Sequence, residues 1–280
     1  MISLNELCRL ISLPDEAADL VCKIAERLDW AAAAPAIKLF YSRDTWMDGV
    51  CALRELFSQE QENKNGFHML TCMLEASRKT FEDYIDLGIG EKIFADTFKM
   101  FSRFVGEHKE SFGEYGFDRD FWTCRIIAME DFRIGEMEYE METVDGHPRI
   151  NLHIPSDASL TPECCRSSVR AAKSFFEEFF PQYHSEAFVC SSWLLSPRLE
   201  HVLRAGSNIM KFQNAFRLIE DQPDDIEYMT WVFKKPGSSL DELPGHTSLQ
   251  RNIRQYLKNG GKIGSSIGIL EDEDFGTACV

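Results

Sequence analysis

The sequence predicts an α+β protein in which an all-helical N-terminal part precedes a mixed part of strands and helices. Two observations support this prediction. Apolar residues recur at helical spacing up to about residue 118, and the alternation typical of strands appears from Trp122 onward. The chain of 280 residues has room for two domains of ordinary size. We therefore expect a helical domain over 1–118, a mixed domain over 119–270 and an acidic, disordered tail over 271–280.

Composition narrows the class of protein. The hydrophobic content of 44% with 27% charged residues is typical of a globular chain with a core, and the net charge of −16 argues against a nucleic-acid partner. No apolar run approaches the roughly 20 residues needed to cross a bilayer, and the first residues lack a secretion-signal pattern. Nine cysteines without CxxC or histidine spacing favour reduced thiols over disulfides or a zinc site. These features predict a cytoplasmic protein with no membrane partner.

The N-terminal domain carries helix signals along most of its length. Pro14 with the following acids is typical of a helix start. Apolar periodicity then predicts helices over 44–57, 67–85 and 91–105. Four phenylalanines share one face of the last of these, and a packed core face is a better interpretation than a cofactor box; they are Phe94, Phe98, Phe101 and Phe104.

Alternation predicts the first strands of the mixed domain. A strand over 132–141 would put Glu136, Glu138 and Glu140 on one face. Asp145-Gly146 predicts a hairpin turn to the next strand, 149–155.

A strand that runs directly into a helix follows. Thr161 is a plausible N-cap with Pro162 at the first helical position, and free N–H groups at a helix N-terminus can receive an anion such as pyrophosphate. Further on, we expect a strand over 187–194, two strands flanking the turn 221–225, a helix from Thr247 and a closing strand over 263–270.

Seven stretches along the chain together resemble a known family. They are Phe101–Val105, Gly116–Trp122, Phe132–Glu140, His153–Asp157, Ser192–Pro197, Ser207–Gln213 and Thr247–Arg251. In this order they resemble the two-domain GNAT-like N-acyltransferases of gut Firmicutes. The resemblance implies a helical N-terminal domain followed by a GNAT-like domain with a central, mostly antiparallel sheet.

The resemblance also implies where CoA or acyl-CoA would bind. In GNAT folds the strand before the main helix contacts the pantetheine arm, and the turn and helix start hold the pyrophosphate. The implied contacts here are Ile154, Pro155, Ser156, Arg166, Ser167, Arg170, Ser192 and Trp193. For the two arginines, the alternative is a solvated basic face. The family's phosphate loop is Gln/Arg-x-x-Gly-x-Gly/Ala, whereas residues 155–172 contain no glycine, which implies another turn geometry or a loss of binding.

Acyl transfer from a thioester needs a base, an oxyanion donor and an acid for the leaving thiolate. Glu138, the central carboxylate of its strand, is one candidate base, and an exposed sheet-face carboxylate is the alternative. His153, near the end of the cofactor strand, is a second candidate or else a structural histidine. Asn208 could point its amide at the leaving group, next to the helix cap Ser207. A cysteine nucleophile finds little support, because no histidine is placed beside Cys164 or Cys190.

The sequence predicts an acyltransferase that uses acyl-CoA and transfers the acyl group to an amine of a small-molecule acceptor. The alternative is a non-catalytic GNAT-derived ligand-binding or interaction module, which the missing glycines favour. A basic run near the C-terminus either steers an anionic ligand or faces the acidic N-terminal domain; it comprises Arg251, Arg254, Lys258 and Lys262.

Overall fold

The computed structural model describes residues 1–58, 65–183, 186–234 and 239–276. The chain forms two compact units, Met1–Arg133 and Ile134–Val280. Among the described residues, no helix is both long enough and apolar enough to cross a membrane.

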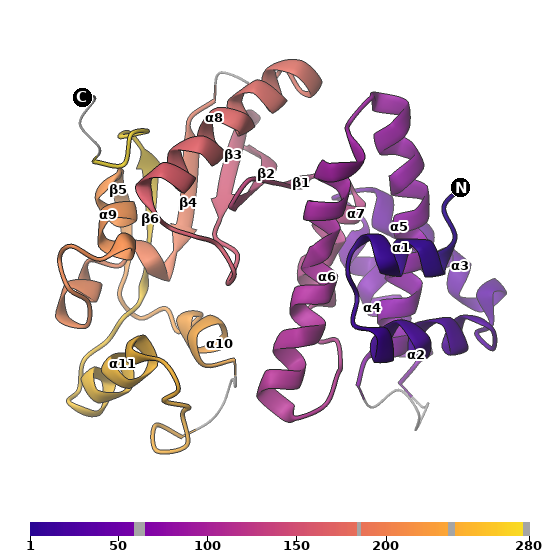
Figure 1. Ribbon diagram of the computed structural model, residues 1–280, viewed down its shortest axis with the longest axis horizontal. Coiled ribbons are helices and arrows are strands. Elements are labelled where there is room, and N and C mark those ends of the chain that lie inside the picture. Colours follow the sequence, from indigo (N-terminus) through magenta and orange to yellow (C-terminus); the bar gives the residue numbers. More distant parts are fainter. Residues whose placement is uncertain (59–64, 184–185, 235–238, 277–280) are drawn as a thin grey trace. The chain divides into compact units, whose positions relative to one another are not determined.

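The first unit is helical, as predicted (Figure 1). Its elements are α1 (Leu4–Leu10), α2 (Asp15–Ala25), α3 (Trp30–Lys38), the 3-10 turn η1 (Leu39–Tyr41), α4 (Trp46–Leu56), α5 (Phe67–Leu87), α6 (Glu91–Phe112) and α7 (Asp120–Ile127).

Aromatic packing on α6 forms much of the core of this unit. The rings of Phe94 and Phe98 stack with centroids 4.1 Å apart, and Tyr84 of α5 meets Phe94 edge-on at 5.1 Å. Phe101 and Phe104 are buried on the same face. The four phenylalanines of α6 therefore belong to the core, as the sequence predicted, and burial of aromatic rings on this scale dominates core stability.

Helix α7 belongs to the helical unit. Asp120 accepts hydrogen bonds from Arg54 Nε and Nη2 at 2.8 and 2.6 Å, and the buried Thr80 hydroxyl donates to the Ile127 carbonyl at 2.9 Å. The division between the units consequently falls after Arg133, further along the chain than the position near residue 118 expected from the sequence.

The remaining elements build a six-stranded sheet with its helices. They are β1 (Asp131–Ile134), β2 (Met137–Val144), β3 (His147–His153), α8 (Pro162–Phe179), β4 (Phe188–Ser192), η3 (Trp193–Leu195), η4 (Pro197–His201), α9 (Asn208–Asn214), β5 (Phe216–Gln222), α10 (Tyr228–Phe233), α11 (Ser248–Lys258) and β6 (Ser265–Leu270).

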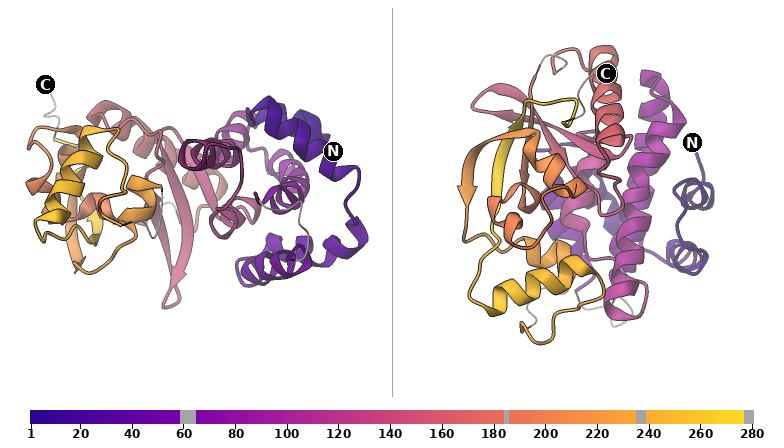
Figure 2. Two further views of the ribbon diagram at one scale, coloured as in Figure 1. Left: turned by 90° about the horizontal axis from the view of Figure 1, so that it is seen from below. Right: turned by 60° about the vertical axis from the view of Figure 1, so that its left-hand side comes forward.

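The strand order is β1-β2-β3-β4-β6-β5. β3 and β4 are parallel and are connected through α8, whereas β2/β3, β4/β6 and β5/β6 are antiparallel. This confirms the predicted α+β fold with a mostly antiparallel sheet. The hairpin of β2 and β3 ends in an exposed tip that extends away from the rest of the sheet (Figure 2).

Turn chemistry explains one prediction that is confirmed and one that is wrong. Asp145 and Gly146 have φ of 52° and 79°, which gives the predicted two-residue hairpin turn. The strand expected over 132–141 is instead two strands, because Gly135 adopts φ of 67° and turns the chain between them. The strand expected after the turn 221–225 is also wrong, since Tyr228–Phe233 is helical.

Helix α8 packs along one face of the sheet (Figure 1) and is bound to the β1–β2 hairpin by one hydroxyl group. Thr161 caps the helix by accepting from the Cys164 N–H at 3.3 Å, as predicted. The buried Ser168 hydroxyl donates to the Ile134 carbonyl, accepts from the Met137 N–H at 3.3 Å and lies 3.0 Å from the Tyr139 hydroxyl. Three backbone or side-chain groups of the hairpin thus meet one side chain of the helix.

The C-terminal segment differs from the predicted disordered tail. The N–H groups of Glu271 and Asp272 each donate to the Ala215 carbonyl at 3.0 Å. Phe275 is 1% exposed, and its ring stacks on that of Phe212 with centroids 6.0 Å apart. Residues 271–276 therefore pack on the second unit; residues 277–280 lie outside the described part of the chain.

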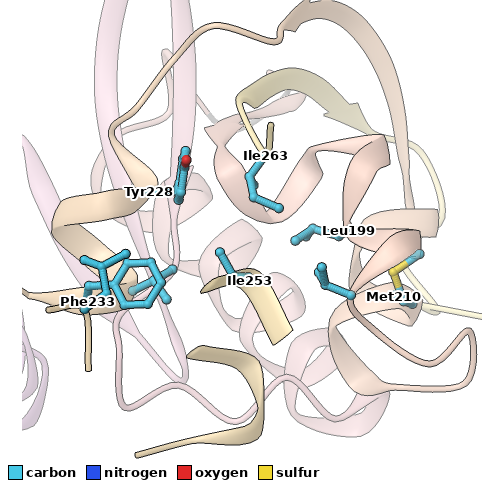
Figure 3. Close-up of a cluster of buried hydrophobic side chains, with 9 residues drawn as sticks. Leu199, Met210, Tyr228, Phe233, Ile253 and Ile263 are labelled. Carbon is cyan, nitrogen blue, oxygen red and sulfur yellow. The ribbon is translucent and has the colours of Figure 1, made fainter. Parts of the chain in front are cut away.

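A second apolar cluster lies among η4, α9, α10 and α11 (Figure 3). Ile253 of α11 and Ile263 are fully buried in it, and Trp193 packs against it. Its other labelled members are Leu199, Met210, Tyr228 and Phe233.

We expect Gly135→Ala to lower the free energy of unfolding by about 1–3 kcal/mol. A Cβ at this position would stand 3.1 Å from Ser168 Cα on a backbone with positive φ. Gly206→Ala is the matched control, because no atom lies within 4 Å of its built Cβ. Urea denaturation of both variants measures the difference, and equal midpoints would contradict the expectation.

Candidate functional site

The parallel strands β3 and β4 pair over a short distance only. Their register joins Ile150 with Phe188 and Asn151 with Val189. Beyond these pairs β3 continues to His153, whereas residues 190–192 of β4 pair with β6 on their other side. Both strands therefore extend past the part of the ladder that joins them.

Side chains of one face of the β2–β3 hairpin form a polar ladder. The register sets Glu138 opposite His153, Glu140 opposite Asn151 and Glu142 opposite Arg149. Side chains alternate across a strand, so these six lie on the face opposite Tyr139 and Leu152. Tyr139 meets Ser168 of α8, which places the polar ladder on the face of the sheet away from α8.

The histidine of the polar ladder is bound to a buried carboxylate. His153 Nε2 lies 2.8 Å from Glu140 Oε2, with 12% of the histidine side chain and 2% of the glutamate side chain exposed. The carboxylate favours the tautomer that carries its proton on Nε2, and in that tautomer the lone pair is on Nδ1. The arrangement is suited to a general base that a carboxylate orients.

A second hydrogen-bonded group occupies the other half of the polar ladder. Glu142 Oε2 accepts from Arg149 Nε at 3.0 Å, and Glu142 Oε1 accepts from Asn151 Nδ2 at 3.2 Å. One carboxylate therefore fixes both a guanidinium group and an amide group of β3.

The structure brings Glu138 and His153 together as cross-strand neighbours. Glu138 is 2% exposed, so the alternative of an exposed sheet-face carboxylate does not hold. The proposed cofactor residues Ile154, Pro155 and Ser156 follow directly after β3. Their loop is held by the Ser159 N–H, which donates to Glu136 Oε2 at 2.8 Å.

Other predicted site residues lie apart from the polar ladder and have structural contacts of their own. Asn208 is exposed at the start of α9, where Ser207 caps the helix by accepting from the Met210 N–H at 3.3 Å. Ser192 accepts from the Leu194 N–H at 3.1 Å, and Trp193 packs against the apolar cluster of Figure 3. The sites predicted on these three residues remain predictions.

The basic face of α8 contacts the C-terminal segment. Arg166 Nη1 and Arg170 Nη2 lie 3.9 and 3.5 Å from Asp274 Oδ1, and Lys173 pairs with Glu273. Ser167 is exposed between the two arginines. The positive charge is therefore matched in part by acidic side chains of the same unit.

The basic run of α11 also has local partners. Arg254 Nη1 donates to the Leu243 carbonyl at 2.8 Å, and Arg251 Nη1 donates to the Gly245 carbonyl at 2.8 Å. Lys258 lies 2.5 Å from Asp241, and Lys262 pairs with Asp224. These contacts bind α11 and the loop after it to the segments before them.

Cys190 and Cys165 lack the features of a nucleophile. Cys190 is buried, and burial raises the pKa of its thiol. Burial likewise raises the pKa of Cys165 to about 12. Among the described residues, no group of three or more His, Cys, Asp or Glu side chains could hold a metal ion.

Two family models match the chain. One describes an N-acyltransferase N-terminal domain and matches residues 2–129; the other describes a GNAT-like C-terminal domain and matches residues 96–270. The chain belongs to the family with the GNAT-like C-terminal domain. The two models confirm the resemblance to two-domain GNAT-like N-acyltransferases.

Solved structures share the fold of this GNAT-like protein. An acyltransferase in complex with decanoyl-CoA and teicoplanin has 22% identity and a TM-score of 0.77, over 95% of this chain and 86% of that chain. A mutant acyltransferase in complex with octanoyl-CoA has 22% identity and a TM-score of 0.78. An acyltransferase in complex with CoA and 10C-teicoplanin has 22% identity and a TM-score of 0.76. Both comparisons cover 95% of this chain and 86% of the other chain. No curated protein sequence matches the chain.

Sequence reasoning missed the partners within the polar ladder. Asn151, Arg149 and Glu142 were not among the predicted site residues, and Glu140 was passed over in favour of Glu138. The signal was present, because a two-residue turn at Asp145-Gly146 fixes the register of the strands that flank it.

We expect a thiol-alkylating reagent to modify Cys51 in the folded protein and to leave Cys165 unmodified. Cys51 is exposed, whereas Cys165 is 1% exposed and its raised pKa leaves few thiolates at pH 8. Peptide mass mapping after alkylation measures both sites, and urea provides the control in which both react. Equal labelling of Cys51 and Cys165 in the folded protein would show that the packing of α8 does not protect Cys165.

Proposed function

We propose that this protein transfers an acyl group from acyl-CoA to the amine of a small molecule. The observation that carries the proposal is the buried Glu140–His153 pair at the end of β3, the strand that precedes the main helix of a GNAT-like fold. Membership of a family described by an N-acyltransferase N-terminal domain and a GNAT-like C-terminal domain supports the same reaction. Membership of this family favours an enzyme over a non-catalytic module.

The reaction needs one proton to move. The amine nitrogen attacks the thioester carbonyl carbon, so that a C–N bond forms and the C–S bond breaks. Nδ1 of His153 takes a proton from the attacking nitrogen, and the Glu140 carboxylate stabilises the resulting imidazolium. The proton then passes to the departing CoA thiolate. Glu138, directly opposite His153, is the second candidate base.

CoA would lie along the loop between β3 and α8. We propose that the backbone of Ile154, Pro155 and Ser156 meets the pantetheine arm, with Ser192 and Trp193 at the end of the neighbouring strand. Arg166, Ser167 and Arg170 on α8 would receive the phosphates in exchange for Asp274. Both arginine–carboxylate distances exceed 3.4 Å, and Arg170 is 70% exposed, so the present pairs are weak and exchangeable.

Two further features complete the proposal. One solved acyltransferase of this fold binds decanoyl-CoA and teicoplanin together, which supports a small-molecule acceptor here. The described cysteines are all unpaired thiols, which supports a reducing compartment such as the cytoplasm.

We expect His153→Gln to reduce kcat/KM for acyl transfer about 10²–10⁴-fold, the range typical of a lost general base. Its affinity for CoA should stay within twofold, because the histidine acts on the amine. Release of free CoA from acetyl-CoA and decanoyl-CoA with a panel of primary amines measures the rate, and calorimetry measures CoA binding.

His201→Gln is the matched control, since His201 is 52% exposed and stacks on Tyr256 away from the polar ladder. Wild-type protein that binds no CoA and transfers no acyl group would refute the proposed function. An unchanged rate in His153→Gln would move the base to Glu138.

We expect Asp274→Asn to tighten CoA binding about 2–10-fold at low salt and Arg170→Glu to weaken it. The Asp274 carboxylate competes with phosphate for the two arginines, and such exposed pairs are worth about 0.2–1 kcal/mol. Calorimetric titration with CoA at two salt concentrations measures both changes. Identical dissociation constants in all three proteins would exclude this face of α8 as the phosphate site.

A further inference from the structure

One atom of the polar ladder has no hydrogen-bond partner. Asn151 Oδ1 is buried and unpaired, and the whole residue is only 9% exposed. Buried polar atoms of folded proteins are nearly always satisfied, so an unpaired acceptor marks a place for a bound water or a ligand. The proposed reaction assigns no role to this side chain.

The orientation of the Asn151 amide is fixed by its neighbours. Nδ2 donates to Glu142 Oε1 at 3.2 Å, and Arg149 holds the same carboxylate in place. The reverse orientation would set Oδ1 against a carboxylate oxygen, with two acceptors facing each other. Oδ1 is therefore directed away from Glu142.

The chemistry around Oδ1 selects a ligand that donates hydrogen bonds. Asn151 lies directly opposite Glu140, whose carboxylate binds His153. An amide oxygen next to a carboxylate group disfavours anions and accepts N–H groups. Through Oδ1 the amide offers this ligand an acceptor and leaves the ligand's own lone pair unused.

We propose that Asn151 binds the amino group of the acyl acceptor through Oδ1. This inference rests on the proposed function and adds to it the side chain that holds the acceptor amine. A primary amine has two N–H groups: one donates to Asn151 Oδ1, and the other gives its proton to His153 Nδ1. The nitrogen lone pair then stays available for the thioester carbonyl. The acceptor is accordingly a primary amine.

Direct binding of a small amine tests the inference without turnover. Methylammonium chloride is titrated into ¹⁵N-labelled protein, and tetramethylammonium chloride, which has the same charge and no N–H group, is the matched ligand. The Asn151 side-chain resonance is assigned by its loss in Asn151→Leu. We expect a saturable shift of this resonance with methylammonium and none with tetramethylammonium.

The variants test the role of the side chain. Asn151→Leu removes the acceptor at similar volume, and we expect methylammonium affinity, followed on the backbone amides of 151–153, to fall at least tenfold. Asn214 is an exposed asparagine at the end of α9, and Asn214→Leu should leave the methylammonium affinity within twofold of the wild-type value. Absence of a saturable shift in the wild-type protein, an equal shift with tetramethylammonium, or full affinity in Asn151→Leu would each overturn the inference.

Calorimetry with CoA on the same samples separates this inference from the proposed function. Binding of methylammonium without binding of CoA would support the amine site and refute the acyltransferase. Binding of CoA without a methylammonium shift would support the acyltransferase and overturn the role of Asn151.

Discussion

The two-residue turn between β2 and β3 sets the register on which the polar ladder depends. Asp145 and Gly146 both adopt positive φ, which matches the twist of the flanking strands and lets pairing begin directly at the turn. Because side chains alternate with a period of two, a slip of one residue would send every carboxylate of β2 to the face of α8. The contact between Glu140 and His153 is thus a consequence of backbone geometry seven residues away from the histidine.

A second constraint holds the loop after β3 between two fixed points. Ser168 joins α8 to the β1–β2 hairpin, and Glu136 in the turn of that hairpin accepts from the Ser159 N–H. Thr161 caps the helix at the end of the same loop. A glycine-rich loop approaches an anion through backbone freedom; this glycine-free loop is instead anchored by side chains, so its N–H groups have fixed directions before any ligand arrives.

Features that depend on neighbours in sequence could be predicted, and features that depend on distant contacts could not. The Asp145-Gly146 turn and the Thr161 cap are local, and both were read correctly. Gly135 was missed although the apolar alternation changes phase there, from Phe132 and Ile134 before it to Met137 after it. The unpaired oxygen of Asn151 has no counterpart in a sequence pattern, since it follows from where the side chains of β2 and β3 meet. Phe275 was hidden by the acidic residues around it.

The burial of Phe275 changes how the C-terminus has to be manipulated. Its ring fills a position against Phe212, so deletion of the last ten residues would remove a core side chain together with the acids that face α8. A truncated protein would therefore report a packing defect and a charge effect as one signal. Point substitutions that keep Phe275 separate the two, and a purification tag or a fusion partner is better attached with a spacer after Val280 than in place of this segment.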